Sequence, residues 1–215
     1  MGDCCTPSGY QWIFSRKSAE SQARRYRRKG LDTTSRRLFD ILRRRDLQGL
    51  TLLEVGGGIG DLQIELLKAG VAHAVSIELT PTYEDAAVAL LRDAGLDGRV
   101  ERRIADFTAA EAEIEAADIV ILNRVLCCYP DMPGLATVAA NHARDVIVLS
   151  FPRSTWWTRA LLGVGNLGLR VARRGFHVFV HSPAGIFATV EQRGLQPAFN
   201  SRGIFWQVAA LERRA

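Results

Sequence analysis

Residues 51–61 read Thr-Leu-Leu-Glu-Val-Gly-Gly-Gly-Ile-Gly-Asp. A short apolar run leads directly into glycines, and apolar residues at helical spacing follow from Leu62 onward. This order predicts a strand, a tight turn and a helix. Glycines let a ligand approach closer than a Cβ would allow, and the free N–H groups at a helix N-terminus suit polar ligand atoms. The stretch therefore predicts a binding loop at the end of a strand.

The spacing of the glycines distinguishes between nucleotide-binding loops. A dinucleotide fingerprint, G-x-G-x-x-G, that starts at Gly56 and Gly58 needs its third glycine at position 61, which is aspartate here. The third glycine is instead Gly60, and the acid Glu54 precedes the loop. This E-x-G-x-G-x-G pattern resembles motif I of the class I S-adenosylmethionine-dependent methyltransferases.

A second apolar run, residues 73–79, carries Glu78 near its end. An acid at the tip of the second strand can accept hydrogen bonds from a ribose diol. Both NAD and S-adenosylmethionine carry that diol, so Glu78 predicts a nucleoside ligand without choosing between them. The alternative interpretation of Glu78 is an ordinary exposed loop acid.

The remaining strand pattern predicts an α/β fold. Apolar runs at 100–107, 118–123 and 145–151 alternate with helical segments, which is typical of a parallel sheet with helices on both faces. A helix at 183–193 and two strands, 195–201 and 204–211, follow. With the resemblance, this predicts a Rossmann-like class I methyltransferase fold: a mostly parallel seven-stranded sheet with a C-terminal antiparallel hairpin.

The resemblance implies S-adenosyl-L-methionine as the cofactor and a role for each loop residue. The acid before the glycines would hold the loop, or the cofactor's amino group through water, and the glycine backbone would meet the methionine part. Asp106 would lie near the adenine amino group with Phe107 against the ring, and Asn123 would reach the amino acid moiety or the acceptor. The predicted cofactor-binding residues are Glu54, Gly56, Gly57, Gly58, Gly60, Glu78, Leu79, Asp106, Phe107 and Asn123.

A narrower resemblance concerns the acceptor side. The segments 125–130 and 146–153 are similar to those of the magnesium-protoporphyrin IX O-methyltransferases and their bacterial relatives. That family carries a histidine at the position of Cys128. A thiol has a higher unperturbed pKa than an imidazole and does not simply replace it as a base. We therefore predict methyl transfer to a small or lipid-like acceptor, acidic acceptors included, and leave the acceptor unassigned.

Methyl transfer from a sulfonium requires alignment, and a base where the nucleophile needs one. Cys128 and Tyr129 follow the fourth strand, where the methyl group should emerge, and Tyr26 would reach the site if the N-terminal arm caps it. These three residues are the predicted catalytic candidates. A cysteine in such a segment, Cys127 above all, can instead be a small buried hydrophobe, and Tyr26 a surface tyrosine.

Two other functions remain open at this point. A catalytically silent nucleoside-binding regulator would keep the loop and lack the base. An NAD(P)-dependent oxidoreductase is disfavoured by the glycine spacing and by the absence of a Tyr-x-x-x-Lys pair.

Length and the distribution of charge indicate how the chain is divided into domains. At 215 residues it is most simply one domain with a sizeable core. Arginine and lysine crowd residues 16–45, so we predict a basic helical arm or cap at 1–32 and a methyltransferase domain at 33–215. The basic charge fits a solvated helical face, attraction to an acidic substrate or an anionic membrane, or nucleic acid, which ranks last because no binding module accompanies it.

An apolar stretch with a basic end predicts a helical insert near 154–175, which would be a lid, a packed helix or a peripheral membrane contact. The four cysteines form adjacent pairs, Cys4-Cys5 and Cys127-Cys128, which fits reduced thiols and not zinc ligands, so no metal is predicted. No run is long enough to span a bilayer and the N-terminus lacks a signal-peptide pattern, so we expect a cytoplasmic protein. The sequence does not predict an oligomeric state.

Overall fold

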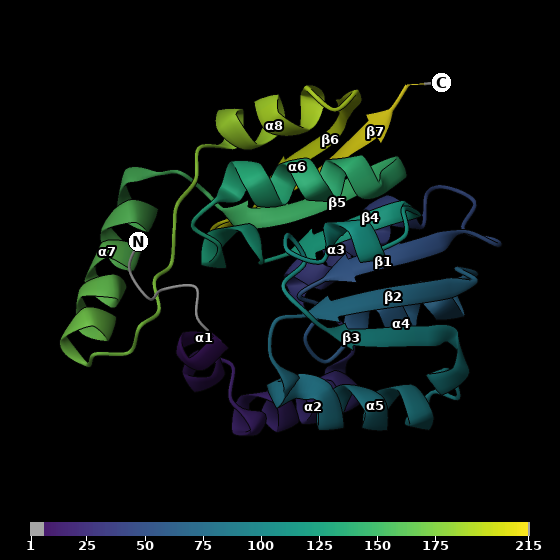
Figure 1. The fold of residues 1–215 in the computed structure, drawn as a ribbon, viewed down its shortest axis with the longest axis horizontal. Coiled ribbons are helices and arrows are strands. Elements are labelled where there is room, and N and C mark those ends of the chain that lie inside the picture. The colour runs from purple at the N-terminus through teal and green to yellow at the C-terminus, as the bar shows by residue number, and fades with distance from the viewer. Residues whose placement is uncertain (1–6, 215) are drawn as a thin grey trace.

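The computed structural model describes residues 7–214, and a seven-stranded sheet dominates it (Figure 1). The strands are β1 (Thr51–Val55), β2 (His73–Glu78), β3 (Val100–Ile104), β4 (Ala117–Asn123), β5 (Ala143–Pro152), β6 (Leu195–Arg202) and β7 (Trp206–Arg213). Their order across the sheet is β3-β2-β1-β4-β5-β7-β6. β1 to β5 pair in parallel, and β7 is antiparallel to both β5 and β6. The predicted fold class is confirmed.

Helices cover both faces of this sheet. They are α1 (Pro7–Ile13), α2 (Arg16–Lys29), α3 (Thr33–Leu42), α4 (Asp61–Lys68), α5 (Glu84–Asp93), α6 (Met132–His142), α7 (Trp156–Val171) and α8 (Pro183–Glu191). Side chains alternate between the faces along each strand, so Leu52 joins the cluster under α2–α5 while Leu53 joins the one under α6 and α8. The core is therefore split into two layers by the sheet.

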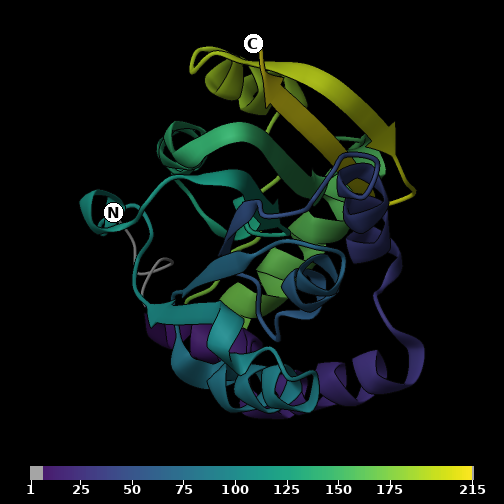
Figure 2. The same ribbon diagram turned by 90° about the vertical axis from the view of Figure 1, so that its right-hand side faces the viewer.

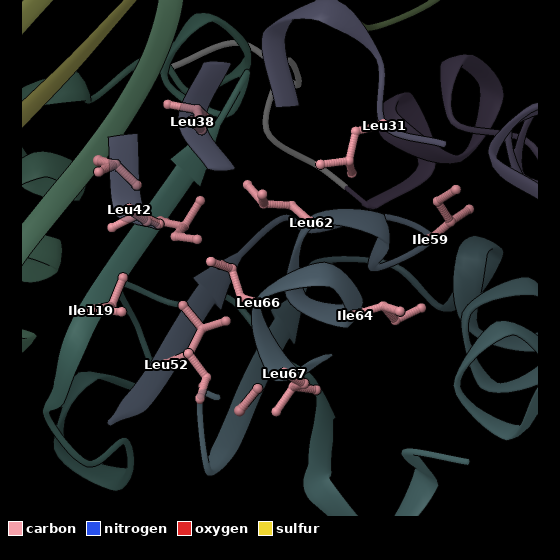
Figure 3. Close-up of a cluster of buried hydrophobic side chains, with 14 of the residues drawn as sticks. Leu31, Leu38, Leu42, Leu52, Ile59, Leu62, Ile64, Leu66, Leu67 and Ile119 are labelled. Carbon is pink, nitrogen blue, oxygen red and sulfur yellow. The ribbon is translucent and has the colours of Figure 1, made fainter. Parts of the chain in front are cut away.

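The first cluster includes Ile59 of the glycine loop (Figure 3). Leu62 and Leu66 of α4 point into it at helical spacing, and Leu38 and Leu42 of α3 do the same from a neighbouring helix; all four are fully buried. Burying each such side chain stabilises the fold by roughly 1.5–3 kcal/mol. This packing holds the start of α4, and with it the loop, in one place against β1.

The N-terminal helices pack onto the domain through α2. Ser15 caps α2 by accepting from the backbone N–H of Ser18 (3.3 Å), and Ala19 and Ala23 are buried. Arg16 and Arg27 form exposed ion pairs with acids of α5, at 3.0 and 2.6 Å. Part of the basic charge of this arm is therefore paired with α5, although such exposed pairs stabilise little.

α7 stands apart from the two layers. Figure 1 shows it beyond the carboxyl ends of the parallel strands, on the same side as α1, and in Figure 2 it runs obliquely from the hairpin side toward the N-terminal helices. Thr158 is the one fully buried residue of this helix. No helix among residues 7–214 combines the length and the apolar composition needed to cross a membrane.

The structure ends the third strand earlier than the sequence predicts. β3 stops at Ile104, and Asp106 begins a turn because its carboxylate accepts from the backbone N–H (3.0 Å) and hydroxyl (2.8 Å) of Thr108. Asp106 and Phe107 are thus loop residues just past the strand end.

Candidate active site

The glycine loop takes a backbone path that other residues would strain. Gly56, Gly58 and Gly60 have φ values of 65°, 61° and 74°. A Cβ added to Gly58 would lie 3.3 Å from the ring of Tyr83, and one added to Gly57 would lie 2.5 Å from the Glu54 carboxylate. The loop therefore requires glycine both for its conformation and for the room below and beside it.

Buried charged groups brace this loop from behind. The backbone N–H of Gly58 donates to Glu78 Oε1 (2.6 Å), and the Arg102 guanidinium donates to the carbonyl oxygen of Gly58 (3.3 Å). Arg102 is itself held by Glu84 (2.9 Å) and has a side chain only 5% exposed. Glu78 thus lies at the end of β2 with its carboxylate against the loop, where a ribose-binding acid is expected.

Three carboxyls around the loop have raised pKa values. Burial raises the pKa of Glu54 to about 8, that of Glu78 to about 7 and that of Asp61 to about 6. Arg102 opposes the shift at Glu54 and Glu78 but does not cancel it. Glu54 Oε2 is buried and has no hydrogen-bond partner among the described residues. Such a cluster favours a ligand that brings hydrogen-bond donors or positive charge.

A cavity of about 250 Å³ opens at the carboxyl ends of β1, β2 and β4. Ten of the residues predicted from the sequence line it: Gly56, Gly57, Gly58, Glu78, Leu79, Asp106, Phe107, Asn123, Cys128 and Tyr129. Glu54 and Gly60 are not in its wall: Glu54 lies beneath Gly57, and Gly60 is the residue before α4. This is the position at which open α/β sheets bind ligands.

Two polar networks cross the cavity wall. Asp106 accepts from Thr108, whose hydroxyl also lies 2.7 Å from the hydroxyl of Tyr129. Asn123 donates to the Ser35 hydroxyl (3.1 Å) and accepts from the Ser150 hydroxyl (2.6 Å). Both networks tie a predicted site residue to a fixed neighbour.

The cysteine pair lies on a short 3₁₀ helix, η4 (Leu126–Cys128), that follows β4. Cys127 is buried, and its Sγ lies 3.7 Å from that of Cys128, which faces the cavity. The neighbouring thiol and burial both raise the pKa of Cys128, so this group stays protonated. Cys4 and Cys5 lie outside the described residues.

The structure does not bring Tyr26 into the cavity. Its hydroxyl donates to Glu65 Oε1 (2.5 Å) on the outer side of α4. Burial and the adjacent Glu65 carboxylate raise the pKa of this phenol. The arm reaches the cavity through Tyr10 of α1, Phe14 just after it and Gln22 of α2 instead, and the Tyr10 hydroxyl donates to the backbone carbonyl of Cys128.

Sequence reasoning also missed Tyr83 and Arg124. Tyr83 lies against Gly58 and joins the loop to α2 through the side chains of Gln22 and Ser18. Arg124 directly follows β4 with a φ of 64°, pairs with Asp32 and lines the cavity. Its position directly after a strand, next to strand-end residues such as Asn123, was the available signal.

Comparison with known proteins agrees with this geometry. No protein-family model matches the chain. A stretch of 111 residues is 32% identical to the ribosomal protein L11 methyltransferase of Edwardsiella ictaluri (strain 93-146). That match spans 47% of this chain and 38% of the other protein, so it covers well under half of the relative.

Solved structures extend the similarity over the whole fold. The magnesium protoporphyrin IX methyltransferase of Synechocystis PCC 6803, with bound SAH, superposes with a TM-score of 0.64 at 19% identity, covering 94% of this chain and 84% of that one. An O-methyltransferase family protein from Burkholderia thailandensis superposes with a TM-score of 0.69 at 20% identity, covering 94% and 64%. The chain therefore has the fold of the class I S-adenosylmethionine-dependent methyltransferases.

Proposed function

We propose that this protein is an S-adenosylmethionine-dependent methyltransferase that acts on a small or lipid-like acceptor. The observation that carries the proposal is the glycine loop whose Gly58 N–H is bonded to Glu78 at the mouth of the cavity. The 32% identity over 111 residues to a methyltransferase, and the SAH bound to a protein of the same fold, support it.

The residues present fit the cofactor. Glu78 would accept from the ribose hydroxyls, Asp106 would lie near the adenine amino group, and Phe107 would pack against the ring. Glu54, whose Oε2 is buried without a hydrogen-bond partner among the described residues, lies beneath Gly57 and would reach the cofactor's amino group through water. When bound, S-adenosylmethionine supplies an activated methyl group on a sulfonium.

The rest of the cavity wall is suited to an acceptor with apolar parts. Tyr10, Phe14, Val125 and Leu135 supply apolar surface there. Arg124 adds a cation whose Nε is buried without a hydrogen-bond partner among the described residues, which suits a carboxylate or another acidic group on the acceptor.

The proposed catalytic set is Cys128 and Tyr129. Tyr129 is joined through Thr108 to Asp106, which gives a route for a proton from the acceptor toward a carboxylate. Cys128, being protonated, would shape the acceptor site and would not act as the base. Tyr26 is left out because its hydroxyl is bonded to Glu65 away from the cavity.

Replacing Cys128 tests this division of roles. Cys128→Ala should leave S-adenosylhomocysteine affinity within about twofold and change turnover of any acceptor found by screening, with Cys127→Ala as the matched buried-thiol control. If Cys128→Ala leaves turnover intact as well, Cys128 is a packing residue.

The cofactor assignment is tested by isothermal titration with S-adenosylhomocysteine and, separately, with NADH. We expect micromolar binding of S-adenosylhomocysteine alone. Tight binding of NADH without S-adenosylhomocysteine would replace the proposal with an oxidoreductase, and binding of neither would make the loop structural.

A further inference from the structure

The helix α7 carries a stripe of exposed apolar side chains. Among the described residues, five of the eight exposed large apolar side chains lie on this one helix, including Trp156 (82% exposed), Val164 (71%) and Val171 (76%). With Ala160 and Leu167 they recur every three or four residues, which places them in one stripe along the helix. A contiguous exposed apolar stripe of this kind marks an interaction surface.

The opposite face of α7 already has its partners within the chain. The Asn166 side chain donates to the carbonyl of Val178 (2.8 Å) and accepts from its backbone N–H (2.9 Å). Thr158 is buried and bonded to Thr155 (2.6 Å). Two polar residues of this face, Thr158 and Asn166, therefore anchor the helix, and the apolar stripe is exposed on the other side.

The charge around the stripe has a single sign. Residues 146–190 contain no Asp or Glu, whereas Arg153, Arg159, Arg170, Arg173 and Arg174 all fall within them. At the end of the helix, the Arg174 guanidinium lies 3.8 Å from the ring centroid of Trp12, which is itself 48% exposed. An apolar stripe with tryptophan and arginine at its margins suits the boundary between lipid headgroups and acyl chains.

This surface lies outside two elements, η4 and α1, that contribute residues to the cavity wall (Figure 1). The carbonyl of Cys127 accepts from the backbone N–H of Phe179 (2.7 Å), and Phe176 packs edge-on against Tyr10 at 5.4 Å between ring centroids. The segment that Asn166 holds is thus the same one that covers η4 and α1. Figure 1 shows α7 outside both, beyond the carboxyl ends of the strands.

We propose that the apolar face of α7, together with Trp12, docks this protein peripherally on an anionic lipid surface. Arginine attracts anionic headgroups while the stripe enters the apolar boundary. A second copy of the chain fits less well, because a twofold interface would bring the same acid-free arginine segments against each other. Docking in this way would place α1 and η4, which line the cavity, on the side that faces the bilayer. The docking proposal does not depend on the methyl-transfer assignment.

Vesicle co-sedimentation tests the proposal. We expect the purified protein to pellet with phosphatidylcholine vesicles that contain phosphatidylglycerol, weakly with phosphatidylcholine alone, and less at raised salt. Val164→Ser with Leu167→Ser should weaken binding about tenfold or more, and Arg170→Gln with Arg173→Gln by a similar factor. These positions are exposed, and unchanged melting temperatures would show that the variants are folded.

Matched controls remove equivalent groups elsewhere. Ile104→Ser takes away an exposed apolar side chain at the far edge of the sheet, and Arg92→Gln an exposed cation on α5; neither should change vesicle binding. Binding that is lost equally in the controls, or that the α7 variants leave unchanged, would overturn the proposal.

Two further outcomes are decisive. Sedimentation velocity without lipid would overturn the proposal if wild type is a dimer that Val164→Ser with Leu167→Ser dissociates, because the stripe is then an interface between copies. Absence of vesicle binding would also overturn it. Titration of the same preparation with S-adenosylhomocysteine keeps that result separate from the fate of the proposed methyl transfer.

Discussion

The two halves of the cavity are built in different ways. The loop half, around Gly58 and Glu78, comes from β1, β2 and the residues directly after them, and is braced by buried groups such as Arg102. The other half, which we propose holds the acceptor and call the acceptor half, brings α1 against η4 and the residue after β4, which lie far from α1 in the sequence. The first half is built from a short, continuous part of the chain and is held rigidly by buried groups. The second half depends on how distant segments of this particular chain pack together.

This difference implies that damage to the loop half should weaken binding of the proposed cofactor, while damage to the acceptor half should leave that binding intact. The following predictions test that contrast, beginning with the largest expected effect.

Gly58→Val should reduce S-adenosylhomocysteine affinity by more than about a hundredfold. A branched side chain is strained at a φ of 61°, and it would meet the ring of Tyr83. Gly95→Val is the matched control, since Gly95 has a φ of 67° and no atom within 4 Å of its Cβ position. If titration finds equal affinity for both variants and wild type, the loop does not contact the ligand.

Glu78→Ala should weaken S-adenosylhomocysteine binding by about 1–3 kcal/mol, the scale of hydrogen bonds to a charged group. The variant also frees the Gly58 N–H, so a melting curve without ligand should accompany the titration. Unchanged binding would remove the ribose assignment.

Cofactor affinity should rise with pH through about 7. In the proposed complex the ribose diol would donate to ionised Glu78, whose pKa is raised to about 7, so binding should be about fivefold to tenfold weaker one pH unit below that value. Titration in buffers of different ionisation enthalpy should detect proton release on binding near pH 7. Glu78→Gln should flatten the dependence of affinity on pH. Asp61 and Glu54 also titrate nearby. If the pH dependence persists in full in this variant, it arises from one of those two carboxyls.

Stability of the ligand-free protein should change in the opposite direction. The pKa of Glu78 is higher in the folded protein than its ordinary value of 4.5. The protonated carboxyl therefore contributes to the free energy of unfolding below pH 4.5, and this contribution is lost as the pH rises through about 7. The melting temperature of the ligand-free protein should therefore fall over this range, and by less in Glu78→Gln.

Tyr26→Phe should have the smallest effect on the site. Loss of the bond to Glu65 should lower the free energy of unfolding by about 1 kcal/mol and leave S-adenosylhomocysteine affinity unchanged. Chemical denaturation and titration measure the two quantities. A loss of affinity or turnover at full stability would return Tyr26 to the catalytic candidates.

The same contrast explains how far the sequence could predict the molecule. The glycine spacing and the acids at strand ends are local patterns, so the sheet, the hairpin and the wall residues Glu78, Asp106 and Asn123 could be read from them. Which tyrosine of the N-terminal arm reaches the cavity, Tyr10 or Tyr26, depends on how α1 and α2 pack against the rest of the domain. The chain changes direction between Ile13, where α1 ends, and Ser15, which caps α2. As a result α2 packs against α5 and α1 lies at the cavity.

The partners of Arg124 and Tyr83 could not be predicted for a related reason. Their roles rest on partners distant in the chain, Asp32 for the first and Gln22 and Ser18 for the second. No periodicity or composition encodes such pairs, whereas the burial of Cys127 followed from the ordinary behaviour of a small thiol.

The position of β7 has a consequence for how the chain folds as it is made. β7 pairs with β5 on one side and β6 on the other, and Arg45 of the segment after α3 pairs with its Glu212 at 2.7 Å. Until residues 206–213 leave the ribosome, β6 has no neighbour and β5 keeps an open edge. The nascent protein should therefore complete its sheet in a late step, after the glycine loop of residues 51–61 has left the ribosome.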